Sequence, residues 1–299
     1  MQETVAVAAV TFDRPDDVQT LLAALAAQDH PLTSVALVDS GTQDVASLAE
    51  QSAAPVNYIR SRTNLGGAGG FSLAILSAIA SGADWVWIMD DDAHPEDTRV
   101  LSSLLKAARE RQLDVVVPLI VAPTDASRLS FPYRVAGRTT HDRKLVEDRG
   151  FIPDIAQFFN GALLRADVFF RVGLPDLRLF IRGDETDFML RLRRAGIPFG
   201  TVTTVALSHP PGWDEVQHVL GDRLHVLVPQ TPFKRFYFFR NRGHLTRRYL
   251  RPKSFIADVV GYPLYYLRRG DVAGLLSWAR AYIAGVRGRS FGPPSDFGF

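Results

Sequence analysis

Three consecutive carboxylates, Asp90, Asp91 and Asp92, follow the apolar run Trp85–Met89. The run is typical of a buried strand, so the three side chains are expected together at its carboxyl end. Like charges this close repel one another, and a divalent cation that also binds phosphate oxygens would neutralise them. The alternative is a solvated turn that opens a helix near Pro95, where acidic residues are favoured. The cluster predicts a divalent-cation site.

The first half of the chain alternates short apolar runs with amphipathic stretches. Strands are expected at 4–10, 35–38, 56–59, 85–89 and 114–117, and helices near 15–28, 43–50, 70–81 and 95–111. Such a βαβ series predicts a mainly parallel sheet with helices on both faces and a ligand crevice at the strands' carboxyl ends. Polar residues follow the strands at this edge: Thr11, Arg14, Asp39, Arg62, Asn64 and the three aspartates.

The second half is less regular. Residues 123–150 show no clear period and are expected to be irregular. A strand is expected near 157–165, a helix from Asp184 and a strand at 198–203. From about Phe233 the pattern becomes helical, aromatic and basic, and the tail at 292–299 is expected to be disordered.

The segment Asn64–Gly70 is rich in glycine. As a loop, it would let the backbone N–H groups of Gly66 and Gly67 approach a phosphate or sugar, at the positive end of the following helix. It lacks the G-x-G-x-x-G spacing of dinucleotide-binding proteins and a Walker lysine. The alternative is that the glycines allow close packing of a helix on the sheet.

Acidic residues also open the helix expected from Asp184. Asp184, Glu185 and Asp187 fall in its first turn, where they could simply complement the helix dipole. Beside a nucleotide-phosphate site, however, a carboxylate there is the expected general base for an acceptor hydroxyl.

His209 closes a strand and could complete a cation's ligand shell, although a lone histidine is more often structural. Trp213 offers an apolar platform for a sugar ring, or else packs in the core.

Composition limits the class of protein. The chain has 299 residues, 46% of them hydrophobic, and can bury a sizeable core. It has no cysteine, which excludes disulfides, thiolate metal ligands and a cysteine nucleophile and is compatible with the cytoplasm. The first residues lack the pattern of a signal peptide, and no segment has the roughly 18 to 20 uninterrupted apolar residues of a membrane span.

Charge divides the chain in two. Residues 229–299 carry 13 Lys and Arg against 3 Asp and Glu, a net charge of +10, which leaves −8 on residues 1–228. We expect a catalytic domain at 1–228 and a basic, aromatic, helical region at 229–299. Basic and aromatic residues together are found in nucleic-acid-binding surfaces and in helices on anionic membranes. The apolar segments near 263–286 favour membrane binding over nucleic-acid binding, so no nucleic-acid partner is predicted.

The ordered motifs resemble the family 2 glycosyltransferases of GT-A fold. They run from residue 4 to about residue 245 as VTFDRP, VDSGT, RTNLGGAGGF, MDDDA, FNGALLRADVF, RGDETDFMLRLRRAG, LSHP and YFFRNRGH. Within this family NLGGAGGF, ADWVWIMDDDA and PDLRLFIRGDETDF are similar to the galactofuranosyltransferases that start the cell-wall galactan of actinobacteria. The resemblance implies a UDP-galactofuranose donor and a polyprenyl-diphosphate-linked oligosaccharide acceptor ending in rhamnose.

The resemblance also implies roles for individual residues. Asp90 and Asp92 would hold Mg²⁺ or Mn²⁺ with His209 as a third ligand. Glu185 would be the base of an inverting displacement, and Asp184, with Trp213, would bind the acceptor. The implied contacts of the nucleotide sugar are Thr11, Arg14, Asp39, Arg62, Asn64, Gly66, Gly67 and Asp91.

The sequence therefore predicts a metal-dependent galactofuranosyltransferase in the cytoplasm, associated with the inner face of the plasma membrane. A rhamnosyltransferase of the same family, with a deoxythymidine-diphosphate-rhamnose donor, is the first alternative. A non-catalytic nucleotide-binding module that docks to a membrane is the second.

Overall fold

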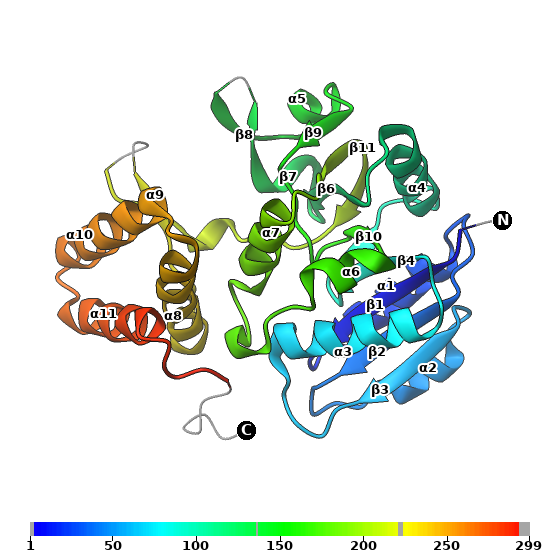
Figure 1. The fold of residues 1–299 in the computed structure, drawn as a ribbon, viewed down its shortest axis with the longest axis horizontal. Helices are drawn as coiled ribbons and strands as arrows, with labels where there is room; N and C mark the ends of the chain where they lie inside the picture. Colours follow the sequence, from blue (N-terminus) through cyan, green and yellow to red (C-terminus); the bar gives the residue numbers. More distant parts are fainter. Residues whose placement is uncertain (1–2, 136, 221–223, 293–299) are drawn as a thin grey trace. The chain divides into compact units, whose positions relative to one another are not determined.

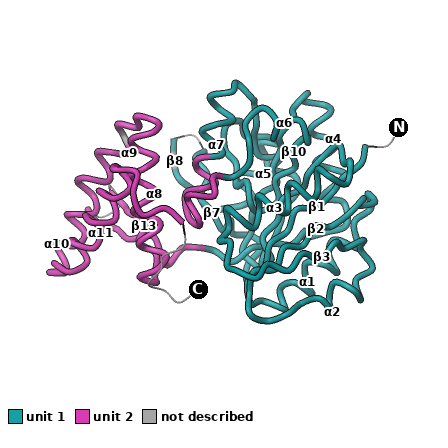
Figure 2. The backbone as a smooth tube through the Cα atoms, turned by 60° about the horizontal axis from the view of Figure 1, so that its bottom comes forward, with its two compact units in different colours: residues 1–175, 188–211 teal, residues 176–187, 212–299 magenta. Residues whose placement is uncertain are grey.

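The computed structural model describes residues 3–135, 137–220 and 224–292. The chain forms two compact units, shown in Figure 2: unit 1 comprises residues 1–175 and 188–211, and unit 2 comprises residues 176–187 and 212–299. The boundary expected between residues 228 and 229 falls inside unit 2. The tail at 292–299 lies, except for Gly292, outside the described residues.

Unit 1 is built on a mostly parallel sheet with the strand order β3-β2-β1-β4-β10-β6-β11-β5 (Figure 1). Strands β3, β2, β1 and β4 are parallel, β10 runs antiparallel between β4 and β6, and β11 is parallel to β6. Every residue of β1 is buried, as expected for a central strand covered on both faces. The path comprises β1 (Val5–Thr11), β2 (Ser34–Asp39), β3 (Val56–Arg60), β4 (Trp85–Asp90), β5 (His94–Pro95), β6 (Val115–Ala122), β10 (Leu163–Arg165) and β11 (Gly200–Ser208).

Helices cover both faces of this sheet, as predicted. One apolar cluster joins α1, α2 and α4 to one face, and a second joins α3, α6 and the later part of α7 to the other. The chain therefore has the α/β arrangement expected from its alternating pattern. The helices are α1 (Pro15–Ala26), α2 (Ala46–Gln51), α3 (Gly66–Ala80), α4 (Val100–Arg111), α6 (Ala166–Val172) and α7 (Asp184–Arg194).

Three predictions of secondary structure outside the glycine-rich segment were wrong. The helix expected from residue 95 begins at Val100, because Pro95 pairs with β11 in the short strand β5. The strand expected at 157–165 is confined to 163–165, after a turn in which Gly161 has a φ of 97°. Residues 123–150 are not irregular. Their secondary structure was not predicted because their strands are polar and half-exposed, and such strands show no clear alternation of apolar and polar residues. They form β7 (Asp125–Val135), β8 (Arg138–Asp142) and α5 (Arg143–Glu147), before β9 (Phe151–Pro153).

Unit 2 is largely helical and has its own apolar cluster. Its helices α8 and α11 approach through glycine: a Cβ added to Gly243 would lie 2.2 Å from the carbonyl oxygen of Tyr282, and one added to Gly285 would lie 1.8 Å from that of Arg240. No helix among the described residues has both the length and the apolar content needed to cross a membrane. The elements are η1 (Leu177–Leu179), η2 (Trp213–Glu215), β12 (Val216–His218), β13 (His225–Leu227), α8 (Pro232–Tyr249), α9 (Pro252–Ile256), the π-helical turn η3 (Ala257–Gly261), α10 (Tyr262–Arg268) and α11 (Val272–Val286).

Candidate active site

The candidate site of unit 1 lies where the order of the sheet reverses. Strand β1 has β2 on one side and β4 on the other, and ligands of open α/β sheets bind at the carboxyl ends beside such a switch point. Thr11 ends β1 and Asp90 ends β4. The Thr11 hydroxyl donates to Asp91 Oδ2 at 2.8 Å, so the two strand ends are joined directly.

The three consecutive aspartates form one cluster, as predicted. One ligand oxygen from each of Asp90, Asp91 and Asp92 lies within 4.8 Å of the others. The Arg14 guanidinium donates to Asp91 Oδ1 at 2.9 Å and also contacts Asp92. His209 Nε2 lies 3.2 Å from Asp92 Oδ1, so of the three carboxylates the imidazole contacts Asp92.

The pKa values of the three aspartates are shifted in different directions. Burial and the charges of Asp91 and Asp92 raise the pKa of Asp90 to about 7. Burial also raises the pKa of Asp91, despite the nearby Arg14. At Asp92 burial acts in the same direction, but the contacts with His209 and Arg14 outweigh it and lower the pKa. Burial lowers the pKa of His209, but the bond and the charge of Asp92 outweigh it and raise this pKa overall.

The cluster has the properties of a hard-cation site. Its donors are carboxylate oxygens, which Mg²⁺ and Mn²⁺ prefer. Within the described residues, the hydrogen bond to the Asp90 side chain comes from the backbone N–H of Asp91, at 3.1 Å. Asp91 is 3% exposed and already bonded to Thr11 and Arg14. Asp90 and Asp92 are partly exposed, whereas Asp91 is buried, so the first two are the more accessible to an added cation.

A second polar network follows β2. Asp39 is fully buried, and its carboxylate accepts hydrogen bonds from Gly41 N at 2.9 Å and from the Tyr58 hydroxyl at 2.8 Å, and it also pairs with Arg60. Asp13 accepts from Gln43 N at 2.8 Å, which ties the turn after β1 to the turn after β2. Arg60 and Asp13 were not predicted, although both lie within three residues of the end of a predicted strand.

The glycine-rich segment is a helix start rather than a loop. Helix α3 begins at Gly66, and Gly67 belongs to its first turn. Asn64 Oδ1 accepts from Gly66 N at 2.8 Å, and Gly66 has a φ of 63°, which a residue with a side chain rarely adopts. A Cβ on Gly70 would lie 3.0 Å from Val10 Cγ1, so the close packing of α3 on the sheet favours glycine here. Arg62 precedes the segment and is exposed.

The acidic pair belongs to unit 2. Asp184 and Glu185 lie in the first turn of α7, Asp184 buried and Glu185 partly exposed. Burial raises the pKa of Asp184 to about 6. Asp187 Oδ1, in the same turn, accepts a hydrogen bond of 2.6 Å from the Tyr249 hydroxyl. Trp213 begins η2 and is partly exposed.

An exposed apolar surface lies on the helical segment from α9 to α10. We call it the apolar stripe and define it as Phe255, Ile256, Val259, Val260 and Leu267, which are 38–61% exposed. Asp258, Tyr262 and Tyr266 of the same segment are buried. Arg268 and Arg269 are exposed next to the stripe, Arg280 is exposed on α11, and Arg287 is exposed at the end of that helix.

Arg247 and Arg248 contribute to the basic charge of this region but bind within unit 2. Arg247 donates to the carbonyl of Val286 at 2.8 Å, and Arg248 lies 3.1 Å from Asp176 Oδ2.

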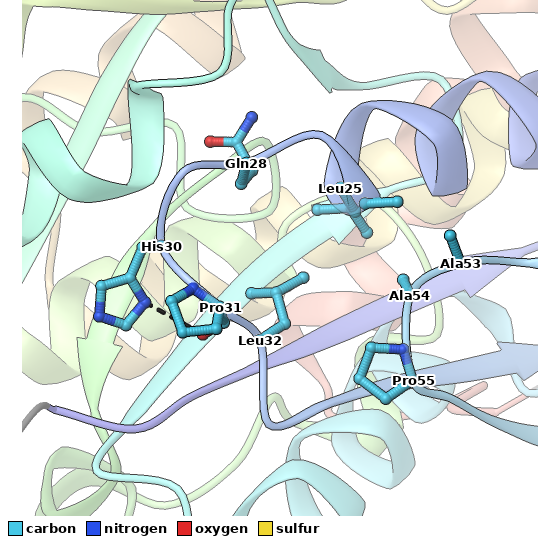
Figure 3. A pocket seen from close by; sticks show the side chains of 9 residues that line it. Leu25, Gln28, His30, Pro31, Leu32, Ala53, Ala54 and Pro55 are labelled. Atoms are coloured by element: carbon cyan, nitrogen blue, oxygen red, sulfur yellow. Dashed lines mark hydrogen bonds between the residues drawn. The ribbon is translucent and has the colours of Figure 1, made fainter.

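A pocket in unit 1 is lined by none of the predicted site residues (Figure 3). Its one titratable side chain is His30, whose Nδ1 lies 3.0 Å from the carbonyl of Pro31, and we assign it no function.

Comparison with known proteins identifies the family. The model of glycosyl transferase family 2 matches residues 6–170. The galactofuranosyltransferase GlfT1 of Mycolicibacterium smegmatis is 41% identical over 295 residues, which cover 96% of this chain and 98% of that protein. The galactofuranosyltransferase GlfT1 of Mycobacterium tuberculosis is 40% identical over 301 residues, covering 98% and 99%.

Solved structures with low sequence identity share the fold. The structure of S. aureus TarS 1-349 in complex with UDP-GlcNAc matches with a TM-score of 0.57 and 13% identity, covering 95% of this chain and 81% of that one. The mannosyltransferase PcManGT from Pyrobaculum calidifontis, in complex with GDP-Man and Mn²⁺, matches with a TM-score of 0.55 and 18% identity, covering 97% and 77%. The chain therefore belongs to glycosyltransferase family 2, as a glycosyltransferase with the GT-A fold.

Proposed function

We propose that this enzyme transfers galactofuranose from UDP-galactofuranose to a lipid-linked acceptor that ends in rhamnose, in the synthesis of cell-wall galactan. The observation that carries the proposal is the 41% identity to a galactofuranosyltransferase over almost the full length of both chains. The similarity extends beyond the shared donor-binding fold into unit 2. A non-catalytic role is not proposed further, because the chain belongs to a family of enzymes.

The donor diphosphate is proposed to bind at the ends of β1 and β4. Asp90 and Asp92 would hold Mg²⁺ or Mn²⁺ with His209 beside Asp92, and a fold relative was determined with Mn²⁺. When bound, such an ion stabilises the departing diphosphate as a Lewis acid. Thr11 and Arg14 lie at the same strand ends and would contact the diphosphate. The other proposed nucleotide contacts are Asp39, Arg62, Asn64, Gly66, Gly67 and Asp91.

The acceptor side of the reaction is assigned to unit 2. Glu185 would take the proton from the attacking acceptor hydroxyl, and Asp184 would bind the acceptor sugar, with Trp213 as an apolar platform for a sugar ring. Attack by the hydroxyl opposite the departing diphosphate inverts the anomeric centre in a single displacement. No protein nucleophile is then required.

We further propose that unit 2 binds the anionic inner face of the plasma membrane from the cytoplasm. Support comes from the apolar stripe and from the charge around it. Of the two carboxylates between residues 229 and 292, Asp258 is buried against Arg242 and Asp271 caps α11 through Gly274 N at 2.7 Å. An exposed apolar face with a basic border is typical of helices in the membrane interface.

A donor screen tests the catalytic proposal. The purified enzyme would be given Mg²⁺ or Mn²⁺, a synthetic rhamnosyl acceptor on a short lipid, and either UDP-galactofuranose or deoxythymidine-diphosphate-rhamnose. We expect galactofuranosyl product, detected by mass spectrometry, with the first donor. Rhamnosyl product with the second donor alone would overturn the proposal in favour of the rhamnosyltransferase.

A further inference from the structure

The backbone that leads into α7 is held in a rare conformation. Phe180 and Arg182 have φ values of 64° and 62°, and Gly183 has a φ of 109°. Residues with a side chain rarely adopt this region, so the surrounding structure must hold them there. The segment ends at Asp184 and Glu185, the pair to which acceptor binding and proton transfer are assigned.

Asn241, a buried residue of α8, binds this backbone at three points. Its Nδ2 lies 2.9 Å from the carbonyl oxygen of Leu179 and 2.8 Å from that of Ile181, and it also contacts the carbonyl of Arg182. Asn241 is 1% exposed. A Cβ on Gly183 would lie 3.0 Å from Asn241 Cβ, so the glycine lets the segment come this close.

The neighbouring Arg240 binds the start of the same segment. Its Nη1 donates to the carbonyl of Arg178 at 2.9 Å and its Nη2 to that of Leu179 at 3.0 Å. Arg240 is fully buried, and burial lowers its pKa to about 10. These hydrogen bonds end on neutral carbonyls, whereas a buried cation is usually paired with a carboxylate. The two hydrogen bonds of the Arg240 guanidinium thus hold the backbone at residues 178 and 179.

Further contacts within unit 2 fix the segment on both sides. The Arg182 guanidinium pairs with both carboxylate oxygens of Glu215, at 2.8 and 2.7 Å. Beyond the acidic pair, Asp187 accepts the hydrogen bond of Tyr249. The start of α7 therefore has little freedom to move within unit 2.

We propose that Asn241 and Arg240 are positioning residues, which fix the start of α7 and thereby the places of the Asp184 and Glu185 carboxylates. The inference rests on the proposed roles of those two carboxylates. Neither positioning residue needs to touch a substrate. A misplacement of about 1 Å at a reacting group is enough to cost about 10²-fold in rate, so such a clamp has a measurable effect on catalysis.

The test uses Asn241→Leu in the full chain, which keeps the size of the side chain and removes its donor. We expect faster hydrogen exchange at residues 178–187 and a fall in kcat of about 10- to 100-fold. The Kd for UDP in the presence of metal should stay within about twofold of the wild-type value, because the residues proposed to bind the diphosphate belong to unit 1. Thr231→Ala is the matched control, since it removes the N-cap of the same helix, where Thr231 Oγ1 accepts from Lys234 N at 3.2 Å. It should leave kcat unchanged.

Two further comparisons guard against a variant that fails to fold. Gly183→Ala disturbs the same contact from the segment's side and should lower kcat without changing α8. Arg240→Lys, which keeps a donor for the carbonyls, should retain more activity than Arg240→Met. A folded Asn241→Leu enzyme with wild-type kcat, or with unchanged exchange at residues 178–187, would overturn the inference. Absence of galactofuranosyl transfer by the wild type would instead overturn the proposed function, and the exchange measurement would still decide whether the clamp exists.

Discussion

His209 and Asp92 are in contact, with 3.2 Å between Nε2 and Oδ1, although they follow two strands that lie far apart in the sequence. The contact links the turn after β4 to the end of β11. It places an imidazole beside the aspartate cluster, where this group could either bind a cation, as proposed, or orient the Asp92 carboxylate. Both roles agree with a cation site built around Asp90 and Asp92.

Replacing a cation ligand should abolish most of the activity. We expect Asp90→Asn and Asp92→Asn each to reduce transfer by about 10²-fold or more, because a bound cation contributes several kcal/mol to the stabilisation of developing charge. Calorimetry should show that each variant loses metal-dependent UDP binding, and excess EDTA should have the same effect on the wild type. Glu110→Gln, at an exposed position of α4, is the control. Full activity in excess chelator would contradict the metal assignment.

The two members of the acidic pair should differ in their kinetic effects. Glu185→Gln removes the base and keeps its size, so kcat should fall by about 10²–10⁴-fold with donor affinity nearly unchanged. Asp184→Asn should chiefly raise the KM for the acceptor. Steady-state kinetics with a soluble acceptor separates them. An active Glu185→Gln enzyme beside an inactive Asp184→Asn enzyme would reverse the two assignments.

Burial of Asp184 should make stability depend on pH. Its folded pKa is raised from 3.8 to about 6, so the folded state keeps a proton that the unfolded chain has released. The contribution of Asp184 to the free energy of unfolding therefore falls as pH rises from about 4 to about 6. In Asp184→Asn this loss is absent, so the stability of the variant relative to wild type should increase over that range by on the order of 2 kcal/mol. Urea denaturation at several pH values measures it, with Asp16→Asn as control. Parallel pH profiles for wild type and Asp184→Asn would show that the shift is absent.

The apolar stripe should drive membrane binding. We expect the double variant Ile256→Ser and Val260→Ser to bind anionic vesicles more weakly, by about 1.5 kcal/mol or more for each large apolar side chain no longer buried. Vesicle sedimentation at low and high salt separates this contribution from the charge, which salt screens over about 10 Å. Phe170→Ser provides a control, because Phe170 is 79% exposed in unit 1. Equal binding by the stripe variant and the wild type would exclude the stripe as the contact, and binding to RNA but not to vesicles would favour a nucleic-acid partner.

The sequence was most informative where structure is decided locally. The apolar run before Asp90 is buried on both sides, and such a run predicts its own strand and the place where that strand ends. The parallel sheet, its switch point and the aspartate cluster follow from this pattern. The helix start at Gly66 was misplaced because a run of glycines favours a loop by itself, whereas here Gly70 lies inside α3 and packs closely against Val10.

Contacts between residues that are far apart in the sequence were not predicted. The pairing of Arg60 with Asp39 joins neighbouring strands, and Asn241 binds carbonyls of an earlier segment. One signal was available, since Arg240 and Asn241 are polar residues inside an aromatic helical stretch. Polar residues in such a stretch indicate buried hydrogen-bond partners, but the pattern does not say which ones.

The clamp on α7 also sets an order of events during synthesis. Asn241 and Leu179 are 62 positions apart, so the segment leaves the ribosome well before its partner. Until α8 has been made, the carbonyl oxygens of residues 178, 179, 181 and 182 lack the donors that Arg240 and Asn241 supply in the folded unit. A growing chain can thus complete most of its donor-binding sheet while the acidic pair is still unplaced. From the proposed roles, we expect a chain that ends before α8 to bind UDP but not to transfer galactofuranose.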